Sequence, residues 1–169
     1  GRSRCRLERD GEEAGDRLGP GVRAHYVHMR GFAGLPPSGF REPGNFMKPV
    51  ADALAGYIRT LKAGPVAVAG HSMGGLVTLI LARDHPDVVD RLTVVDVPAF
   101  FSVLINPFAS ASGMGSLAEH SRRNYFEKSG KSLEEDLKRS SEKLVTAPEN
   151  LPRVLRWGME SDRATTADV

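Results

Sequence analysis

Residues 70–74 read Gly-His-Ser-Met-Gly and match the pattern G-x-S-x-G. An apolar run, Pro65–Ala69, precedes this pattern, and an apolar segment that Pro86 ends follows it, so a strand and a helix are expected on its two sides. A chain that passes from strand to helix within about two residues strains the central residue and lifts its side chain above the sheet edge. The Ser72 hydroxyl is therefore predicted to be exposed and to act as a nucleophile.

The rest of the turn fits the same chemistry. Gly70 and Gly74 are expected to give the reversing chain the space it needs. The backbone N–H of Met73, at the helix start, is expected to point at a developing oxyanion, where such a donor is worth ~3 to 4 kcal/mol. The alternative is a plain strand-to-helix turn without chemistry. A phosphate-binding loop is disfavoured because the pattern G-x-x-x-x-G-K-[ST] is absent.

The segments around the turn predict a parallel α/β sheet. Residues 24–29 are β-prone and run into a long loop over 32–40. Asn45 is expected to cap a helix whose apolar residues recur at spacings of three and four until Gly64 stops it. Residues 92–95 repeat the apolar pattern of 65–69. Strand, helix, strand, helix and strand therefore follow one another, which is the pattern of crossover connections in a parallel sheet.

The two ends of the chain differ from its middle. Residues 1–22 are rich in Arg, Gly and acidic residues with few apolar ones, and we expect them to be disordered or foreign to the fold. After Asp96 the strand pattern gives way to three expected helices. One of them is predicted to begin at the capping-box sequence that starts at Ser132, and another follows Asn150.

Composition narrows the classes of function. The chain has 169 residues and a formal net charge of +2, and it contains no run of five or more Lys and Arg residues, so a nucleic-acid partner is not expected. No apolar stretch approaches the ~18 to 20 residues that cross a bilayer, and the first residues lack the apolar core of a secretion signal. We therefore expect a soluble domain and leave its compartment open. A lone cysteine, Cys5, supports neither a disulfide nor a metal site, and no cofactor is expected.

At these motifs the sequence resembles the α/β-hydrolase family, lipase and esterase branch. The resemblance rests on residues 66–75, on the helix that ends at Pro86, on residues 92–96 and on residues 29–34. It implies a partial α/β-hydrolase fold with a core portion over 23–100 and a helical cap over 101–169. It also implies Ser72 as nucleophile and the Met73 N–H as one oxyanion donor, and the serine disfavours epoxide hydrolases and dehalogenases.

A serine needs a general base, and the base needs an orienting acid. The resemblance implies the chain order Ser, acid, His, which makes Asp96 a candidate acid and His120 a candidate base. Asp96 could instead be a turn residue, and His120 could lie on a solvated helix surface. Structural roles are expected for the other histidines, which are His25, His28, His71 and His85.

Two parts of the resembled fold have no counterpart here. Residues 1–21 lack the apolar strand ending in His-Gly, and no histidine loop follows later strands. We therefore interpret the chain as an internal portion of a longer hydrolase.

The expected activity is cleavage of a small ester through an acyl-enzyme, and the alternative is an inactive fragment or interaction scaffold. An apolar substrate portion is expected from the apolar residues near the site, which are Phe32, Phe40, Phe100, Phe101, Leu104, Ile105 and Trp157. The alternative is that these residues belong to the hydrophobic core.

Overall fold

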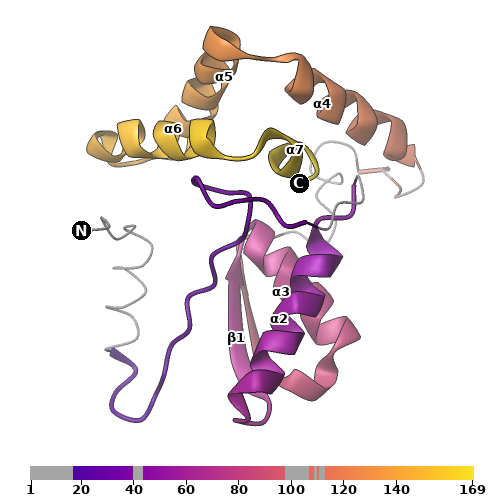
Figure 1. Cartoon of the computed structure of the whole chain (residues 1–169), viewed down its shortest axis with the longest axis vertical. Helices are drawn as coiled ribbons and strands as arrows, with labels where there is room; N and C mark the ends of the chain where they lie inside the picture. Colours follow the sequence, from indigo (N-terminus) through magenta and orange to yellow (C-terminus); the bar gives the residue numbers. More distant parts are fainter. Residues whose placement is uncertain (1–16, 40–43, 98–106, 109, 111–112) are drawn as a thin grey trace.

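The computed structural model describes residues 17–39, 44–97, 107–108, 110 and 113–169. Figure 1 shows a lower part in which two helices lie beside a small sheet, and an upper part made only of helices. The lower part contains α2 (Met47–Leu61), β1 (Val66–His71), α3 (Met73–Asp84), the short 3-10 helix η1 (Pro86–Val88) and β2 (Val89–Val95). The upper part contains α4 (Gly115–Glu127), α5 (Gly130–Glu142), the 3-10 helix η4 (Pro148–Asn150), α6 (Leu151–Glu160) and α7 (Arg163–Ala167).

The strand, helix and strand predicted around the Ser72 turn are present. β1 and β2 pair in parallel, with Val68 opposite Leu92 and His71 opposite Val95. Helix α3 packs on both strands, and α2 packs on α3. Both helices therefore lie on the same side of the sheet (Figure 1). The carboxyl ends of the strands point toward the upper helices, so a residue that follows β1 faces that part of the molecule.

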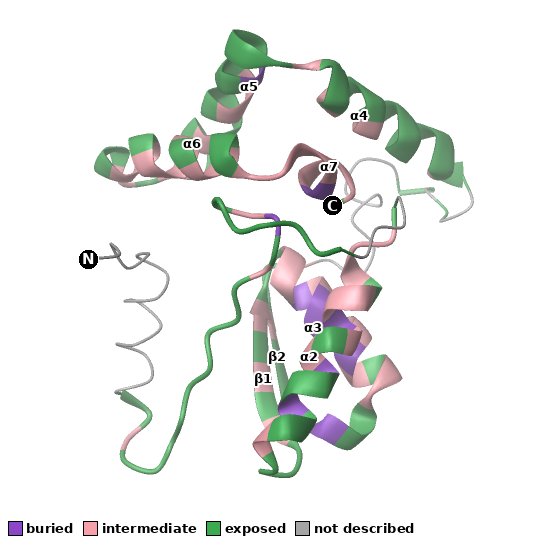
Figure 2. Ribbon diagram, viewed as in Figure 1, coloured by how far each residue is buried: buried purple, intermediate pink, exposed green. Residues whose placement is uncertain are grey.

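The hydrophobic core lies between α2 and α3. Ala51, Ala55 and Ile58 are buried along α2, at spacings of four and three that place them on one helix face. They pack against a matching set from the next elements, which is Val77, Leu81 and Val88. Figure 2 shows this buried layer between the two helices. On β1, half-buried residues alternate with exposed ones, so one face of this strand is partly covered.

Residues 24–29 do not form the predicted strand. They have no regular secondary structure, although they run extended beside the lower part (Figure 1). A strand exists only where a neighbouring chain completes its hydrogen bonds. Within the described ranges the sheet has two strands, and neither pairs with this segment. The β propensity of residues 24–29 therefore correctly indicated extended backbone, but the prediction that they pair in the sheet was wrong.

The ends of two helices also differ from the sequence prediction. Helix α2 is capped at Phe46 and not at Asn45, without a side-chain hydrogen bond, and its C-terminal cap is Lys62 at φ 52° and not Gly64. Helix α5 begins one turn before the predicted start, because its N-cap is Ser129 and not Ser132. The Ser129 N–H donates to Ser132 Oγ at 3.2 Å, and this hydroxyl donates back to the Ser129 carbonyl at 2.9 Å.

The loop after residue 30 joins the lower part to α7. The Asp162 N–H donates to the Gly31 carbonyl at 2.7 Å, and the Ala33 N–H donates to Ser161 Oγ at 3.1 Å. Gly31 has φ +90°, and a Cβ there would lie 2.6 Å from Thr165 Oγ1. The backbone of this loop therefore lies directly against α7. In the part of the chain that the structure describes, no helix is long and apolar enough to span a bilayer.

Candidate active site

Ser72 lies between the carboxyl end of β1 and the first turn of α3. Its φ is 52° and its ψ is −125°, a conformation that residues with a Cβ rarely adopt. The Ser72 N–H donates to the Val95 carbonyl at 3.0 Å, and the Ser72 carbonyl accepts from the Gly75 and Leu76 N–H groups at 2.8 and 3.2 Å. These bonds fix the turn to β2 on one side and to α3 on the other. The residue itself is exposed.

The glycines around Ser72 have different steric roles. A Cβ at Gly70 would lie 2.3 Å from the Gly74 carbonyl oxygen, so a side chain at Gly70 would require the backbone to move. A Cβ at Gly75 would lie 2.5 Å from Val97 Cγ2. At Gly74 the nearest atom to a Cβ is Met29 Cε, at 3.9 Å, which is ordinary van der Waals contact. The tight approach is therefore between the end of β1 and the backbone of the α3 start.

Met73 is the first residue of α3. The first N–H groups of a helix have no acceptor inside the helix, and together they carry a partial positive charge. The Gly75 and Leu76 N–H groups already donate to Ser72. The Met73 N–H, directly after the serine, is the donor that the sequence predicts for an oxyanion at Ser72, and its role stays a prediction.

Asp96 and His71 lie together next to Ser72. Asp96 follows β2, has φ 54°, and its Oδ2 is 3.8 Å from His71 Nε2. Both side chains are well exposed, at 87% and 68%. The pairing follows from the parallel register, because His71 and Val95 are opposite one another at the carboxyl edge. Sequence reasoning did not pair these residues, although the two expected parallel strands that end at them were a usable signal.

Three of the other histidines, His25, His85 and His120, have partners away from Ser72. His120 lies on α4, where its Nε2 is 2.9 Å from Asn124 Nδ2 on the next turn of the helix. His25 Nδ1 is 2.7 Å from the Tyr57 hydroxyl, and His85 Nε2 is 2.8 Å from Asp52 Oδ1. Among the described residues no hydrogen bond joins a histidine to the Ser72 hydroxyl. The structure therefore brings Ser72, Met73, His71 and Asp96 to one edge and leaves His120 on a separate helix.

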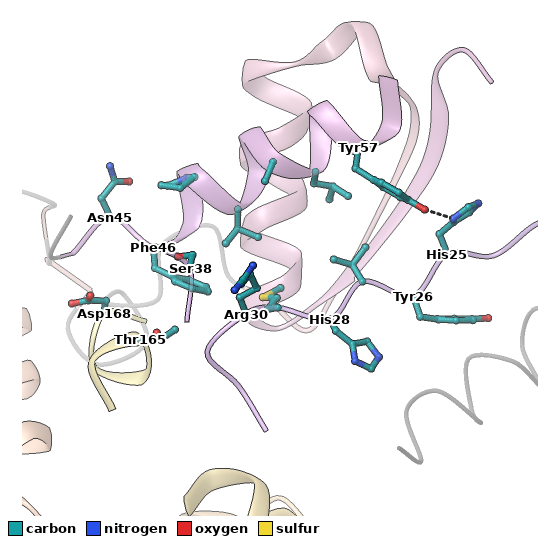
Figure 3. Close-up of a pocket in the computed structure, with 16 residues that line it drawn as sticks. His25, Tyr26, His28, Arg30, Ser38, Asn45, Phe46, Tyr57, Thr165 and Asp168 are labelled. Carbon is teal, nitrogen blue, oxygen red and sulfur yellow. Dashed lines mark hydrogen bonds between the residues drawn. The ribbon is translucent and has the colours of Figure 1, made fainter. Parts of the chain in front are cut away.

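Two further features bear on binding. A cavity of about 490 Å³ lies between residues 25–30 and α2, and none of its lining residues comes from the turn at 70–74 (Figure 3). Within the described ranges, no group of three or more His, Cys, Asp and Glu side chains is arranged to hold a metal ion. Part of the predicted apolar surroundings, namely Phe40, Phe100, Phe101, Leu104 and Ile105, lies outside the described residues.

Sequence comparison establishes the family. A family model described as "Alpha/beta hydrolase family" matches residues 12–167. The chain therefore belongs to the alpha/beta hydrolase family, as the motif around Ser72 and its neighbouring elements predicted. The similarity to a solved structure, that of the N-acyl homoserine lactonase AidH complexed with N-butanoyl homoserine, supports the same fold. The TM-score is 0.53 at 16% sequence identity, over 83% of this chain and 47% of that chain.

Curated relatives match over shorter stretches. The chain is 48% identical over 44 residues to an sn-1-specific diacylglycerol lipase of Mus musculus, which is 26% of this chain and 14% of the lipase. It is 41% identical over 61 residues to an esterase of Mycobacterium tuberculosis, which is 36% of this chain and 20% of the esterase. The chain thus spans a fifth or less of these relatives and about half of the lactonase.

Proposed function

We propose that this chain is a serine hydrolase that cleaves a small-molecule ester with an apolar portion. Ser72 Oγ attacks the ester carbonyl, and the Met73 N–H stabilises the resulting oxyanion. Loss of the alcohol leaves an acyl group on Ser72, and water then releases the acid. In this proposal residues 23–100 form the catalytic core portion and residues 101–169 form the cap.

The observation that carries the proposal is the backbone of Ser72. An exposed serine at φ 52° costs of order 1 to 3 kcal/mol, and such strain persists where the surrounding structure holds it and tends to occur at functional sites. The hydrogen bonds to Val95, Gly75 and Leu76 supply that restraint. The printed names of the relatives, a lipase and an esterase, support ester chemistry for this site.

The acid and the base stay predictions. Asp96 directly follows β2 at the edge of the sheet where Ser72 lies, and this position suits an acid that orients a histidine. In the structure its carboxylate faces His71. His120 would serve as the base only if α4 moved from its position in this structure, since its described partner is Asn124. The substrate's apolar portion would meet the aromatic residues of the cap, of which Trp157 on α6 lies 5.4 Å from the Arg153 guanidinium.

A second candidate is an inactive scaffold of the same fold. The observation that favours it is that the described partners of the histidines are residues other than Ser72. A serine without a general base is a weak nucleophile at neutral pH. The two candidates differ in one measurable property, which is whether the Ser72 hydroxyl is activated.

A fluorophosphonate probe measures that activation. The proposal expects covalent labelling of the wild-type chain and its loss in Ser72→Ala. Ser121→Ala, which removes another exposed serine from α4, is the matched control and should be labelled like the wild type. Circular dichroism confirms that each variant is folded. A folded wild-type chain that stays unlabelled would support the inactive scaffold instead.

A further inference from the structure

The upper part of the molecule divides into two pairs of helices. Helix α4 packs on α7, and α5 packs on α6, while within the described residues no comparable packing joins one pair to the other. Figure 1 shows the α5–α6 pair on one side of the upper part and α4 and α7 on the other. We call residues 130–160, which contain α5 and α6, the helical hairpin. The two pairs differ in what holds them.

Helices α4 and α7 are fixed to each other. The Arg163 guanidinium, at the start of α7, donates to three backbone carbonyls at the C-terminal end of α4, two of them at 2.8 and 2.6 Å. A cation is favourable there, because the last carbonyl groups of a helix have no partner inside it and carry a partial negative charge. Arg122 Nε on α4 also donates to Asp168 Oδ1 at 2.7 Å, and the Asp168 side chain is only 7% exposed. The two helices therefore form one unit.

The loop at 31–34 fixes this unit to the lower part of the molecule. The Asp162 N–H, next to α7, donates to the Gly31 carbonyl, and the Ala33 N–H donates to Ser161 Oγ. Gly31 is buried against α7. The α4–α7 unit is therefore held both to itself and to the loop that follows residue 30.

The helical hairpin has no such attachment. Among the described residues, no hydrogen bond or ion pair joins residues 130–160 to a residue outside 128–161. The contacts at its base are the ion pair between Lys128 and Asp136 and the approach of Glu160 to Gly34, where a Cβ would lie 3.6 Å from Glu160 Oε2. The hairpin is thus held at its base, and its length beyond the base lacks polar bonds to the rest of the described chain.

The two helices of the hairpin nevertheless hold each other firmly. A Cβ at Gly158 on α6 would lie 3.2 Å from Leu137 Cδ1 on α5, so the helices approach closely at this glycine. Leu133 on α5 is buried, at 5% exposure. Close packing of this kind makes two helices move together and not independently. The hairpin is therefore expected to behave as one rigid body.

Two short links connect the hairpin to the α4–α7 unit. Lys128 and Ser129 lie between α4 and α5, with ψ of 139° and 162°, and Ser161 and Asp162 lie between α6 and α7, with ψ of 143° and 122°. All four residues have extended backbones between helices. Residues at the ends of elements that absorb changes of φ and ψ are the usual hinges of rigid-body movement. The links also adjoin one another, because Arg163 donates to the Lys128 carbonyl.

We propose that residues 130–160 move as one rigid lid about the links 128–129 and 161–162, while α4 and α7 stay fixed to the loop at 31–34. The carboxyl ends of β1 and β2 point toward the upper helices (Figure 1), so this movement changes the space in front of the exposed Ser72. Control of ester access to Ser72 rests on the proposed function. The movement itself does not.

Distances between two spin labels on the full chain, measured by pulsed electron paramagnetic resonance, test the proposal. Cys5→Ser removes the native thiol, and Gly56→Cys on α2 carries the reference label, where the Cβ position has open space. The second label is at Glu135→Cys on α5 or, as the matched control, at Ala118→Cys on α4, and both are exposed helix positions. We expect the distance distribution to Glu135→Cys to be at least about twofold broader than that to Ala118→Cys.

Equal widths for the two pairs would overturn the proposal. Two narrow distributions would show a fixed hairpin, and two broad ones would show that α4 moves as well. Arg163→Met removes the bonds between α7 and the end of α4, so it should broaden the Ala118→Cys distribution, and an unchanged width would contradict the fixed unit. Circular dichroism checks the folding of each variant. Because the distances do not depend on Ser72 chemistry, a chain that a fluorophosphonate does not label would refute the proposed function and leave the lid standing.

Discussion

At the scale of single residues, Ser72 combines strain and exposure, and stability measurements can detect the strain. Glycine adopts positive φ without the penalty of a Cβ. We therefore expect Ser72→Gly to have a free energy of unfolding about 1 to 2 kcal/mol higher than Ser72→Ala, with neither variant labelled by a fluorophosphonate. Urea denaturation measures the difference. Equal stability of the two variants would show that the backbone of Ser72 is relaxed in solution.

Gly70 gives a steric prediction. Because its Cβ would lie 2.3 Å from the Gly74 carbonyl oxygen, Gly70→Ala should lower the free energy of unfolding by about 1 to 3 kcal/mol. Gly56→Ala, in the middle of α2 with open space around its Cβ position, is the control. Gly56→Ala should raise the free energy of unfolding by about 0.5 to 1 kcal/mol. A Gly70→Ala variant as stable as the wild type would be incompatible with the turn described here.

At the scale of elements, the carboxylate of Asp52 and its partners Lys48 and His85 connect α2 with the end of α3. The Lys48 ammonium donates to both oxygens of Asp52 at 2.8 and 2.9 Å, and His85 approaches Asp52 Oδ1 at 2.8 Å. The hydrogen bond from Lys48, followed by the one from His85, holds the pKa of Asp52 below its ordinary value. The ionised carboxylate is therefore favoured in the folded state.

This lowered pKa makes part of the stability dependent on pH. The contribution is present above the unfolded-state pKa of about 3.9 and is lost as the pH falls through the lower pKa of the folded state. Asp52→Asn should therefore be less stable than the wild type at neutral pH, and the difference should shrink below about pH 4. Urea midpoints from pH 7 to pH 3 measure it. A difference that grew toward low pH would have the wrong sign for this account.

The contact between the loop at 31–34 and α7 gives a second prediction at the scale of elements. Asp162 caps α7, because its Oδ1 accepts from the Thr165 N–H at 2.8 Å and from Thr165 Oγ1 at 2.7 Å. Asp162→Ala should therefore cost about 0.5 to 2 kcal/mol, and proteolysis near α7 should be faster. Glu149→Ala in η4 is the control and should have little effect. Unchanged proteolysis in Asp162→Ala would contradict the role of this cap.

The elements also show what the sequence could predict. The run at 65–69, the turn at 70–74 and the helix that ends before Pro86 are local patterns, and the structure confirms the strand, helix and parallel strand. Residues 24–29 were mispredicted because sheet pairing depends on a neighbour that local sequence does not reveal. The His71–Asp96 contact depends on the register of the two parallel strands, so it could have been found only by pairing the expected strand ends and not from the local pattern around Ser72.

At the scale of the whole molecule, the fold is established and the chemistry is proposed. The chain belongs to the alpha/beta hydrolase family, and its parallel strands direct the turn at Ser72 toward the helices α4–α7 (Figure 1). The described histidines contact other partners, and water attack on an acyl-enzyme needs a general base. Acylation of Ser72 needs a base as well, but p-nitrophenolate is a better leaving group than the Ser72 alkoxide. We therefore expect acylation to exceed the rate of acid release, and steady turnover of short p-nitrophenyl esters to be slow.

The central claim is that Ser72 carries the acyl group. Intact-mass spectrometry of the full chain after exposure to p-nitrophenyl butyrate tests it most directly, followed by peptide mapping. The account expects one butyryl group per chain, located on Ser72 and absent from Ser72→Ala. An unmodified wild-type chain that is folded, or the same modification in Ser72→Ala, would contradict it.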